Sequence, residues 1–345
     1  MDRRSLIILI LIAAVAVVIS LALVASRDEP ASVAAPSTSA PAQESTTTPP
    51  LSTEPDPTAS TTSPETTTTA TPGVTLAPGA TACDPYTTVS VTGTVASPDL
   101  VEASGMAASR TSPGVLWAHN DSRDGARVYA LGPDGADLGA FDIAGALAFD
   151  WEDMAAGPGS DPTRSMLFLG DIGDNFSIRS GRITVYRVPE PDPGSIDGSI
   201  DGAIPLEYQY PDGVYNSEAL FVTEGSIFII TKDRDETRVY RGDATGDGST
   251  VETLELITVL SLGAEVSGAD MSWDGSTIAF RGYKTVWLWH RSPGMEISEA
   301  LAAEPCTAPS PDEVQGESIA FLADGSYSTV SEGSNPDLHL VVRDG

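Results

Sequence analysis

The chain has 345 residues, with 49 Asp and Glu residues against 18 Lys and Arg residues, so its formal net charge is -31. A surface of this charge repels phosphate backbones, which excludes nucleic acid as an expected partner. It is compatible with divalent cations, with cationic ligands or simply with solubility.

The N-terminal segment, residues 1–27, predicts a membrane anchor. Residues 5–25 carry no charged side chain and follow Arg3 and Arg4. About 20 apolar residues cross a bilayer as a helix, and the apolar core of a cleavable signal peptide is shorter. We therefore expect an uncleaved signal anchor. Cleavage near Ala25 is the alternative and would release a secreted protein.

The two arginines predict the orientation of this anchor, because positive charge stays on the cytoplasmic side. The N-terminus is expected in the cytoplasm, and the C-terminal domain outside a single-pass cell membrane. Residues 28–82 are mostly Thr, Ser, Pro and Ala, and have almost nothing to bury. They predict a disordered stalk between the anchor and a folded domain at residues 83–345.

A short motif recurs five times in the folded domain. It consists of two residues that are mostly small or acidic, one apolar anchor residue, and a further residue. The anchors lie 48 to 66 residues apart and are Met106, Met154, Leu220, Met271 and Ile319. Strand-rich units with a period near 50 residues are typical of propeller blades.

Strand patterns after each anchor predict an all-β propeller with five four-stranded blades. The apolar segment 88–95 precedes the first motif and is expected to close the ring as the outer strand of the last blade. Six blades are the alternative, because the second unit carries an insertion around residues 194–202. A β-sandwich competes less well, since it does not require the same motif in every period.

The two cysteines, Cys83 and Cys306, predict a disulfide, because paired cysteines are usual in exported domains. Neither lies in a CxxC or Cys/His cluster, which disfavours a metal or redox site.

The motif predicts an acidic mouth at one end of the propeller channel, because the inner strands of all blades begin there. The first strands contribute Glu152, Asp153, Glu218, Asp270 and Glu317, and Trp151 lies beside them. The ends of the second strands add Asn120, Asp121, Asp171, Lys232, Arg281 and Glu332.

A ring of carboxylates requires compensation. A bound hard cation such as Ca²⁺ is one interpretation. Ion pairs with Lys232 and Arg281, raised pKa values, and hydrogen bonds to backbone N–H groups of neighbouring blades are the others. His119 is a candidate general base, with a structural corner histidine as the alternative.

Signatures of the common enzyme classes are absent from the sequence. It contains no G-x-S-x-G, H-E-x-x-H, P-loop or dinucleotide fingerprint.

Four runs, GVLWAHNDS at 114–122, DWED at 150–153, GDIGDN at 170–175 and QGESIA at 315–320, resemble a group of exported, actinobacterial-type propeller-like proteins. That resemblance covers essentially all of residues 83–345 and implies the fold and export. A more distant resemblance, to propellers of the phytase and lactonase kind, implies Ca²⁺ at the channel mouth. By that resemblance its ligands are expected to be Glu152, Glu218, Asp270 and Glu317. The chain has few basic residues to hold a polyphosphate, in contrast to phytases.

The leading hypothesis is therefore a membrane-anchored, extracytoplasmic propeller that binds a ligand or divalent cation at its mouth. One alternative is a Ca²⁺-dependent hydrolase of a lactone or phosphoester, with His119 or a metal-bound water as base. Another is a scaffold for an envelope protein. The expected partners are the membrane and a small molecule or envelope protein.

Overall fold

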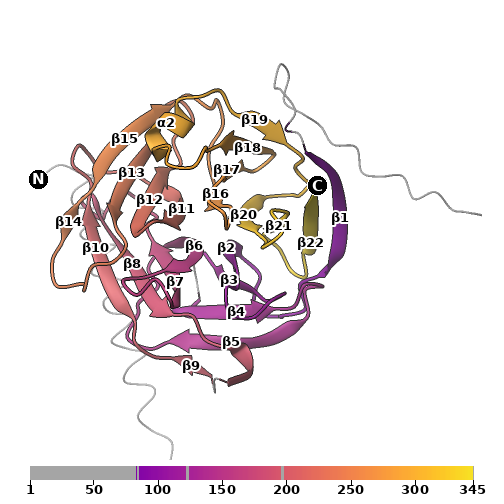
Figure 1. Cartoon of the computed structure of the whole chain (residues 1–345). Helices are drawn as coiled ribbons and strands as arrows, with labels where there is room; N and C mark the ends of the chain where they lie inside the picture. The colour runs from indigo at the N-terminus through magenta and orange to yellow at the C-terminus, as the bar shows by residue number, and fades with distance from the viewer. Residues whose placement is uncertain (1–82, 84, 122–123, 196–197, 345) are drawn as a thin grey trace, which may run out of the picture. The chain divides into compact units, whose positions relative to one another are not determined.

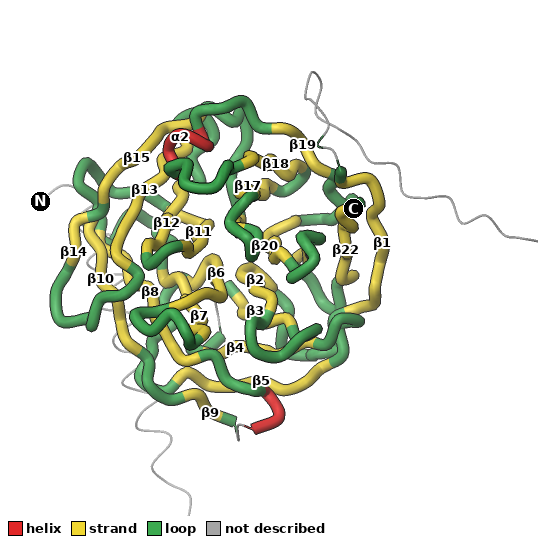
Figure 2. Tube along the Cα trace, viewed as in Figure 1, coloured by secondary structure: helices red, strands yellow, loops and turns green. Residues whose placement is uncertain are grey.

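The computed structural model describes residues 83, 85–121, 124–195 and 198–344. The predicted anchor and stalk lie outside these residues. Within them, no helix is both long and apolar enough to cross a membrane. Strands and loops make up almost all of this part, with η1 (Pro193–Ser195) and α2 (Ile297–Leu301) as its helical segments (Figure 2).

The described strands form five sheets arranged around a central axis (Figure 1), as predicted. Blade 1 contains β2 (Ala103–Ala108), β3 (Leu116–Asn120), β4 (Arg127–Leu131) and β5 (Asp137–Ile143). Blade 2 contains β6 (Trp151–Pro158), β7 (Ser165–Asp171), β8 (Arg182–Pro189) and β10 (Ile204–Gln209). Blade 3 contains β11 (Ser217–Thr223), β12 (Ser226–Thr231), β13 (Thr237–Asp243) and β15 (Glu255–Leu260).

The last two blades follow the same plan. Blade 4 contains β16 (Gly268–Met271), β17 (Thr277–Gly282), β18 (Thr285–His290) and β19 (Cys306–Ala308). Blade 5 contains β20 (Gly316–Phe321), β21 (Tyr327–Ser331), β22 (Asp337–Arg343) and β1 (Tyr86–Thr94). Successive inner strands, β2, β6, β11, β16 and β20, contact one another in a closed ring.

The insertion around residues 194–202 made six blades an alternative. In the structure it adds a strand to blade 1 and does not form a further blade. Its strand β9 (Ser199–Ile200) pairs in parallel with the end of β5, so it widens blade 1 at the outer edge. A second short strand, β14 (Glu252–Thr253), likewise pairs in parallel with β10 of blade 2. Both additions cover a sheet edge, which would otherwise expose unpaired backbone groups.

The ring closes through the N-terminal strand, as predicted. Strand β1 pairs antiparallel with β22, and Val89 faces Val341 in that register. A disulfide joins Cys83, just before β1, to Cys306, the first residue of β19. The closing strand of blade 5 is therefore tied covalently to the outer strand of blade 4.

The hydrophobic core consists of five clusters, each between two neighbouring blades of the described chain. Between blades 3 and 4, Phe221, Phe280 and Trp289 pack together, with 4.9 Å between the ring centroids of Phe280 and Trp289. A fully buried large side chain contributes about 1.5–3 kcal/mol. The blades are thus held mainly by aromatic and aliphatic packing, which fixes the position of their inner strands.

We expect the disulfide to stabilise the closed ring. Its sequence separation is 223 residues, and a cross-link of a long loop restricts the unfolded chain. The double variant Cys83→Ser/Cys306→Ser should lose about 2–4 kcal/mol of unfolding free energy, as measured by urea denaturation. Reduction of the parent protein should give the same change, and an unaltered midpoint in both experiments would contradict this expectation.

Candidate functional site

The acidic motif coincides with a β-bulge at the channel mouth. In four of the described inner strands one extra residue interrupts the pairing with the second strand, between Ala103 and Met106, Trp151 and Met154, Ser217 and Ala219, and Gly316 and Ser318. Strand β16 pairs without such a shift, and there Ala269 takes the first motif position. Bulges redirect side chains, which explains why both residues of the pair leave the regular alternation.

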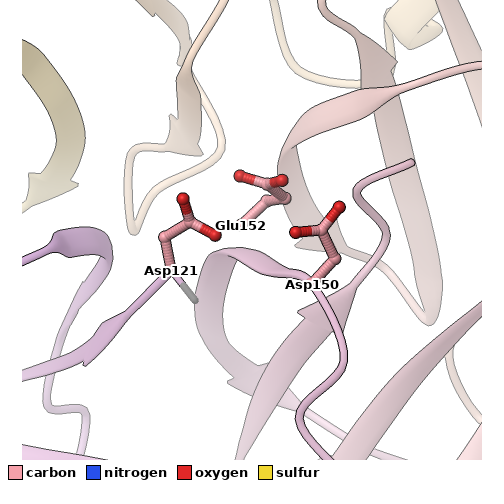
Figure 3. Close-up of side chains that lie close together, drawn as sticks. All are labelled: Asp121, Asp150 and Glu152. Atoms are coloured by element: carbon pink, nitrogen blue, oxygen red, sulfur yellow. The ribbon is translucent and has the colours of Figure 1, made fainter. Parts of the chain in front are cut away.

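Three carboxylates from blades 1 and 2 meet at this mouth (Figure 3). Asp121 directly follows β3, Asp150 directly precedes β6, and Glu152 is the second residue of β6. One oxygen from each lies within 4.8 Å of the others. We call Asp121, Asp150 and Glu152 the carboxylate trio.

The protein compensates the trio only in part. The Asp150 carboxylate accepts a hydrogen bond from the Asn175 N–H, and nearby Arg179 opposes the burial that raises the pKa of Asp150. Glu152 is only 2% exposed, and its Oε1 has no hydrogen-bond partner in the described part of the chain. The same holds for Oδ1 of Asp121. Burial, followed by repulsion from Asp150 and Glu218, raises the pKa of Asp121 to about 7. Burial and repulsion from Glu218 and Asp121 raise the pKa of Glu152 well above its usual value.

On the opposite side of the mouth, Glu218 and Glu317 are partly compensated by neighbouring side chains. Lys232 Nζ lies 2.8 Å from Glu218 Oε2, and Asn216 donates a hydrogen bond to Glu218 Oε1 at 2.8 Å. Gln315 donates to Glu317 Oε1 at 2.9 Å, while Glu317 Oε2 has no hydrogen-bond partner among the described residues. Burial raises the pKa of Glu332, and nearby Lys232 opposes this shift. Of the four predicted metal ligands, the structure therefore places only Glu152 in the trio.

Asp153 and Asp270 bind backbone rather than line an open mouth. Asp153 Oδ2 accepts hydrogen bonds from the N–H groups of Leu220 at 2.9 Å and Ala269 at 3.0 Å, and its Oδ1 accepts from Met154 at 2.8 Å. Asp270 accepts from Met271 and Phe321, both at 2.7 Å. These bonds join blades 2, 3 and 4, and blades 4 and 5. They correspond to the alternative in which carboxylates satisfy neighbouring backbone N–H groups.

His119 and Trp151 lie in the interior instead of at the mouth. His119 is fully buried, with its ring centroid 5.3 Å from that of Trp151, and burial lowers its pKa. Trp151 packs between blades 1 and 2 and donates its indole N–H to Leu147 O at 2.9 Å. Because both side chains are buried against each other, His119 does not contact a ligand at the mouth.

Three other predicted mouth residues have structural partners. Asn120 Oδ1 accepts from the N–H groups of residues 101 and 102, at 3.0 and 2.9 Å. Asp171 pairs with Arg179 and accepts from the Asp150 N–H at 3.0 Å. Arg281 is fully buried and pairs with Glu313.

Asp150 is the trio member that was not predicted as a site residue. It lies in the run DWED at 150–153, two residues before Glu152, and Trp151 between them packs into the core. Gly173 approaches the two carboxylates so closely that a Cβ there would lie 2.1 Å from Glu152 Oε1 and 2.6 Å from Asp150 Oδ2.

No protein-family model and no curated protein sequence matches this chain. Among solved structures it is similar to a PQQ-bound aldose sugar dehydrogenase from Streptomyces coelicolor, with 13% identity over 74% of this chain and 98% of that chain and a TM-score of 0.44. A gluconolactonase from Xanthomonas campestris is 14% identical over 80% of this chain and 86% of that chain, with a TM-score of 0.39. Both are distant propeller-type structures.

Asp153→Ala should destabilise the fold strongly. The substitution leaves three buried N–H groups without an acceptor, and each such group costs about 1–3 kcal/mol. We expect a loss of about 3 kcal/mol or more in urea denaturation. The control Asp312→Ala, whose carboxylate is exposed and paired only with exposed Lys284, should stay within about 0.5 kcal/mol of the parent. Equal effects of the two substitutions would contradict the role of Asp153.

Glu317 should make the fold less stable as the pH rises. Burial, with repulsion from Glu218 and Glu332, raises its pKa to about 8, against roughly 4.3 in an unfolded chain. A raised carboxyl pKa stabilises the folded state fully below the unfolded pKa, and this stabilisation is lost as the pH rises through about 8.

Glu317→Gln should remove this contribution. Between about pH 5 and pH 8, the parent should lose unfolding free energy relative to the variant, on the order of a few kcal/mol. Urea denaturation in EDTA across this range measures the difference. The exposed Glu304→Gln serves as control and should run parallel to the parent. Parallel curves for Glu317→Gln as well would show that Glu317 does not titrate in this way.

Proposed function

We propose that this protein binds a divalent cation at its channel mouth through the carboxylate trio of Asp121, Asp150 and Glu152. The observation that carries the proposal is the buried carboxylate of Glu152. Its Oε1 has no protein partner among the described residues, and it faces two further carboxylates. Burying like charges together is unfavourable, and a cation between them relieves both the repulsion and the missing contact.

The donor set favours a hard cation. All three side chains offer oxygen, with no His or Cys in the cluster, and Ca²⁺, Mg²⁺ and Mn²⁺ prefer such ligands. Ca²⁺ binds oxygens at about 2.3–2.6 Å, so two ligands on opposite sides of it lie roughly 4.6–5.2 Å apart. One oxygen from each member of the trio lies within 4.8 Å of the others, so a single cation can contact all three. Ca²⁺ takes about 6–8 oxygen ligands, so three carboxylates leave positions for water or a ligand.

We propose further that this binding takes place outside the cytoplasm. The disulfide between Cys83 and Cys306 supports an exported domain, because disulfides persist in oxidising compartments. The apolar residues 5–25 and the resemblance to exported propeller-like proteins support the same setting. In this arrangement the segment 28–82 would hold the propeller at a distance from the membrane.

The alternative function, a Ca²⁺-dependent hydrolase, would lack the general base expected from His119. His119 is buried between blades and its pKa is lowered, so it neither reaches a ligand at the mouth nor carries a proton readily. A cation-bound water would have to act as nucleophile without it. Binding of a cation, and of a ligand through that cation, is therefore the function that the geometry supports best.

Addition of Ca²⁺ after treatment with EDTA should stabilise the parent protein. A cation that binds only the folded state adds about 2.7 kcal/mol at 100 times its Kd. For a domain of this size that corresponds to a rise of roughly 5–10 °C in Tm. Isothermal titration calorimetry should give one site per chain.

Glu152→Gln should abolish this response, and Glu317→Gln is its matched control. Both residues are buried glutamates in the first motif position of their blades, but only Glu152 belongs to the trio. Glu317→Gln should keep the Ca²⁺ affinity within about threefold, since it removes only a more distant charge. The proposal fails if the parent shows no stabilisation, or if both variants lose it equally.

A further inference from the structure

Two loops beside the carboxylate trio expose four large apolar side chains. Leu147 and Phe149, between β5 and β6, are 73% and 59% exposed, and Phe176 and Ile178, between β7 and β8, are 84% and 60% exposed. We call these four residues the apolar rim. Large apolar side chains that are exposed together on a protein surface are typical of a binding surface.

The two loops that carry the apolar rim adjoin the trio. Phe149 precedes Asp150 in the chain, and the backbone N–H of Asn175 donates a hydrogen bond to the Asp150 carboxylate. Phe176 follows Asn175, so exposed phenylalanines stand next to both partners of this bond. The Gly173 N–H also donates to the Asp150 backbone carbonyl at 3.2 Å, which holds the second loop against the first.

The loops are held in place by their own polar side chains. The Asp174 carboxylate accepts hydrogen bonds from the N–H groups of Ile178 at 2.7 Å and Arg179 at 3.1 Å. The Arg179 guanidinium lies 4.6 Å from the ring centroid of Phe149 and pairs with Asp171. The exposure of the apolar rim is therefore built into hydrogen-bonded loops, which hold it beside the trio.

We propose that the ligand of the channel mouth is a small amphipathic molecule, with an oxygen-donor head that completes the coordination of the cation and an aromatic or branched aliphatic body that packs on Phe149 and Phe176. This inference rests on the proposed cation site. The head follows from the coordination positions that three carboxylates leave on a hard cation. The body follows from the position of the apolar rim beside those carboxylates.

Two matched pairs of probes test the proposal on the Ca²⁺-loaded protein. Glycolate is compared with mandelate, and ethane-1,2-diol with 1-phenylethane-1,2-diol, so that each pair shares a head and differs by a phenyl group. The two pairs distinguish an anionic from an uncharged head. In at least one pair the phenyl compound should bind at least about tenfold more tightly in ligand-observed NMR titrations, since burying an aromatic group gives about this factor.

Phe149→Ser/Phe176→Ser should reduce that ratio to near one and leave Ca²⁺ affinity unchanged. The single variant Phe176→Ser, at the most exposed of the four positions, should give part of the effect. Val314→Ser is the control, because Val314 is 93% exposed and precedes blade 5, away from blade 2 in the chain. It should keep the ratio of the parent.

Failure of this inference is distinguishable from failure of the cation site. If Ca²⁺ binds but the phenyl compounds bind no better than their heads alone, the apolar rim does not hold the ligand and only this inference falls. It also falls if the phenyl compounds bind equally in EDTA, or if the double variant instead abolishes a self-association of the parent seen in sedimentation. Absence of Ca²⁺ binding overturns the proposed function itself.

Discussion

The carboxylate of Asp153 is the contact on which the centre of the propeller depends. It accepts hydrogen bonds from backbone N–H groups of its own blade and of the next two, so one buried side chain joins the inner strands of blades 2, 3 and 4. Asp270 continues the connection to blade 5. Where the inner strands converge on the axis, some backbone N–H groups have no hydrogen-bond partner within a sheet. One carboxylate can accept hydrogen bonds from several of them at once. Burial still raises the pKa of Asp153, so these bonds oppose a large desolvation cost.

The buried acids of this domain differ in how they are compensated. Asp153 and Asp270 use backbone donors, Glu218 uses Lys232 and Asn216, and Glu313 uses Arg281, Thr329 and His339. In the trio, Asp150 accepts a hydrogen bond from the Asn175 N–H, whereas Asp121 Oδ1 and Glu152 Oε1 have no hydrogen-bond partner among the described residues. This contrast identifies a site better than acidity does, because acidic side chains occur throughout a chain with a net charge of -31. Glu317 Oε2 is also a buried carboxylate oxygen without a hydrogen-bond partner in the described part of the chain, but Glu317 does not belong to the cluster of three carboxylates.

A β-bulge and a closely packed loop position both the carboxylate trio and the apolar rim. The bulge in β6 turns Glu152 toward the mouth and Asp153 toward the axis. Gly173 allows the next loop to approach Glu152 and Asp150 without a side chain between them. That loop then carries Phe176 and Ile178 outward, and it is held by Asp174. Charge and apolar surface are therefore adjacent because a single blade supplies most of both, and a ligand that meets one also meets the other.

The sequence by itself determined the propeller, its closure by the N-terminal strand and the pairing of Cys83 with Cys306, because these follow from a period near 50 residues and from counting strands and cysteines. It favoured five blades over six, and the pairing of β9 with β5 decided the count. The sequence also indicated an acidic mouth. Only the tertiary structure decided which acids form a site. Glu152, Glu218 and Glu317 occupy the same motif position, yet their partners differ, since those partners come from other strands and loops. His119 and Trp151 likewise face the core. Periodicity sets the position of a residue along its blade, whereas compensation of a charge depends on distances of a few ångströms between blades, which only the packed ring establishes.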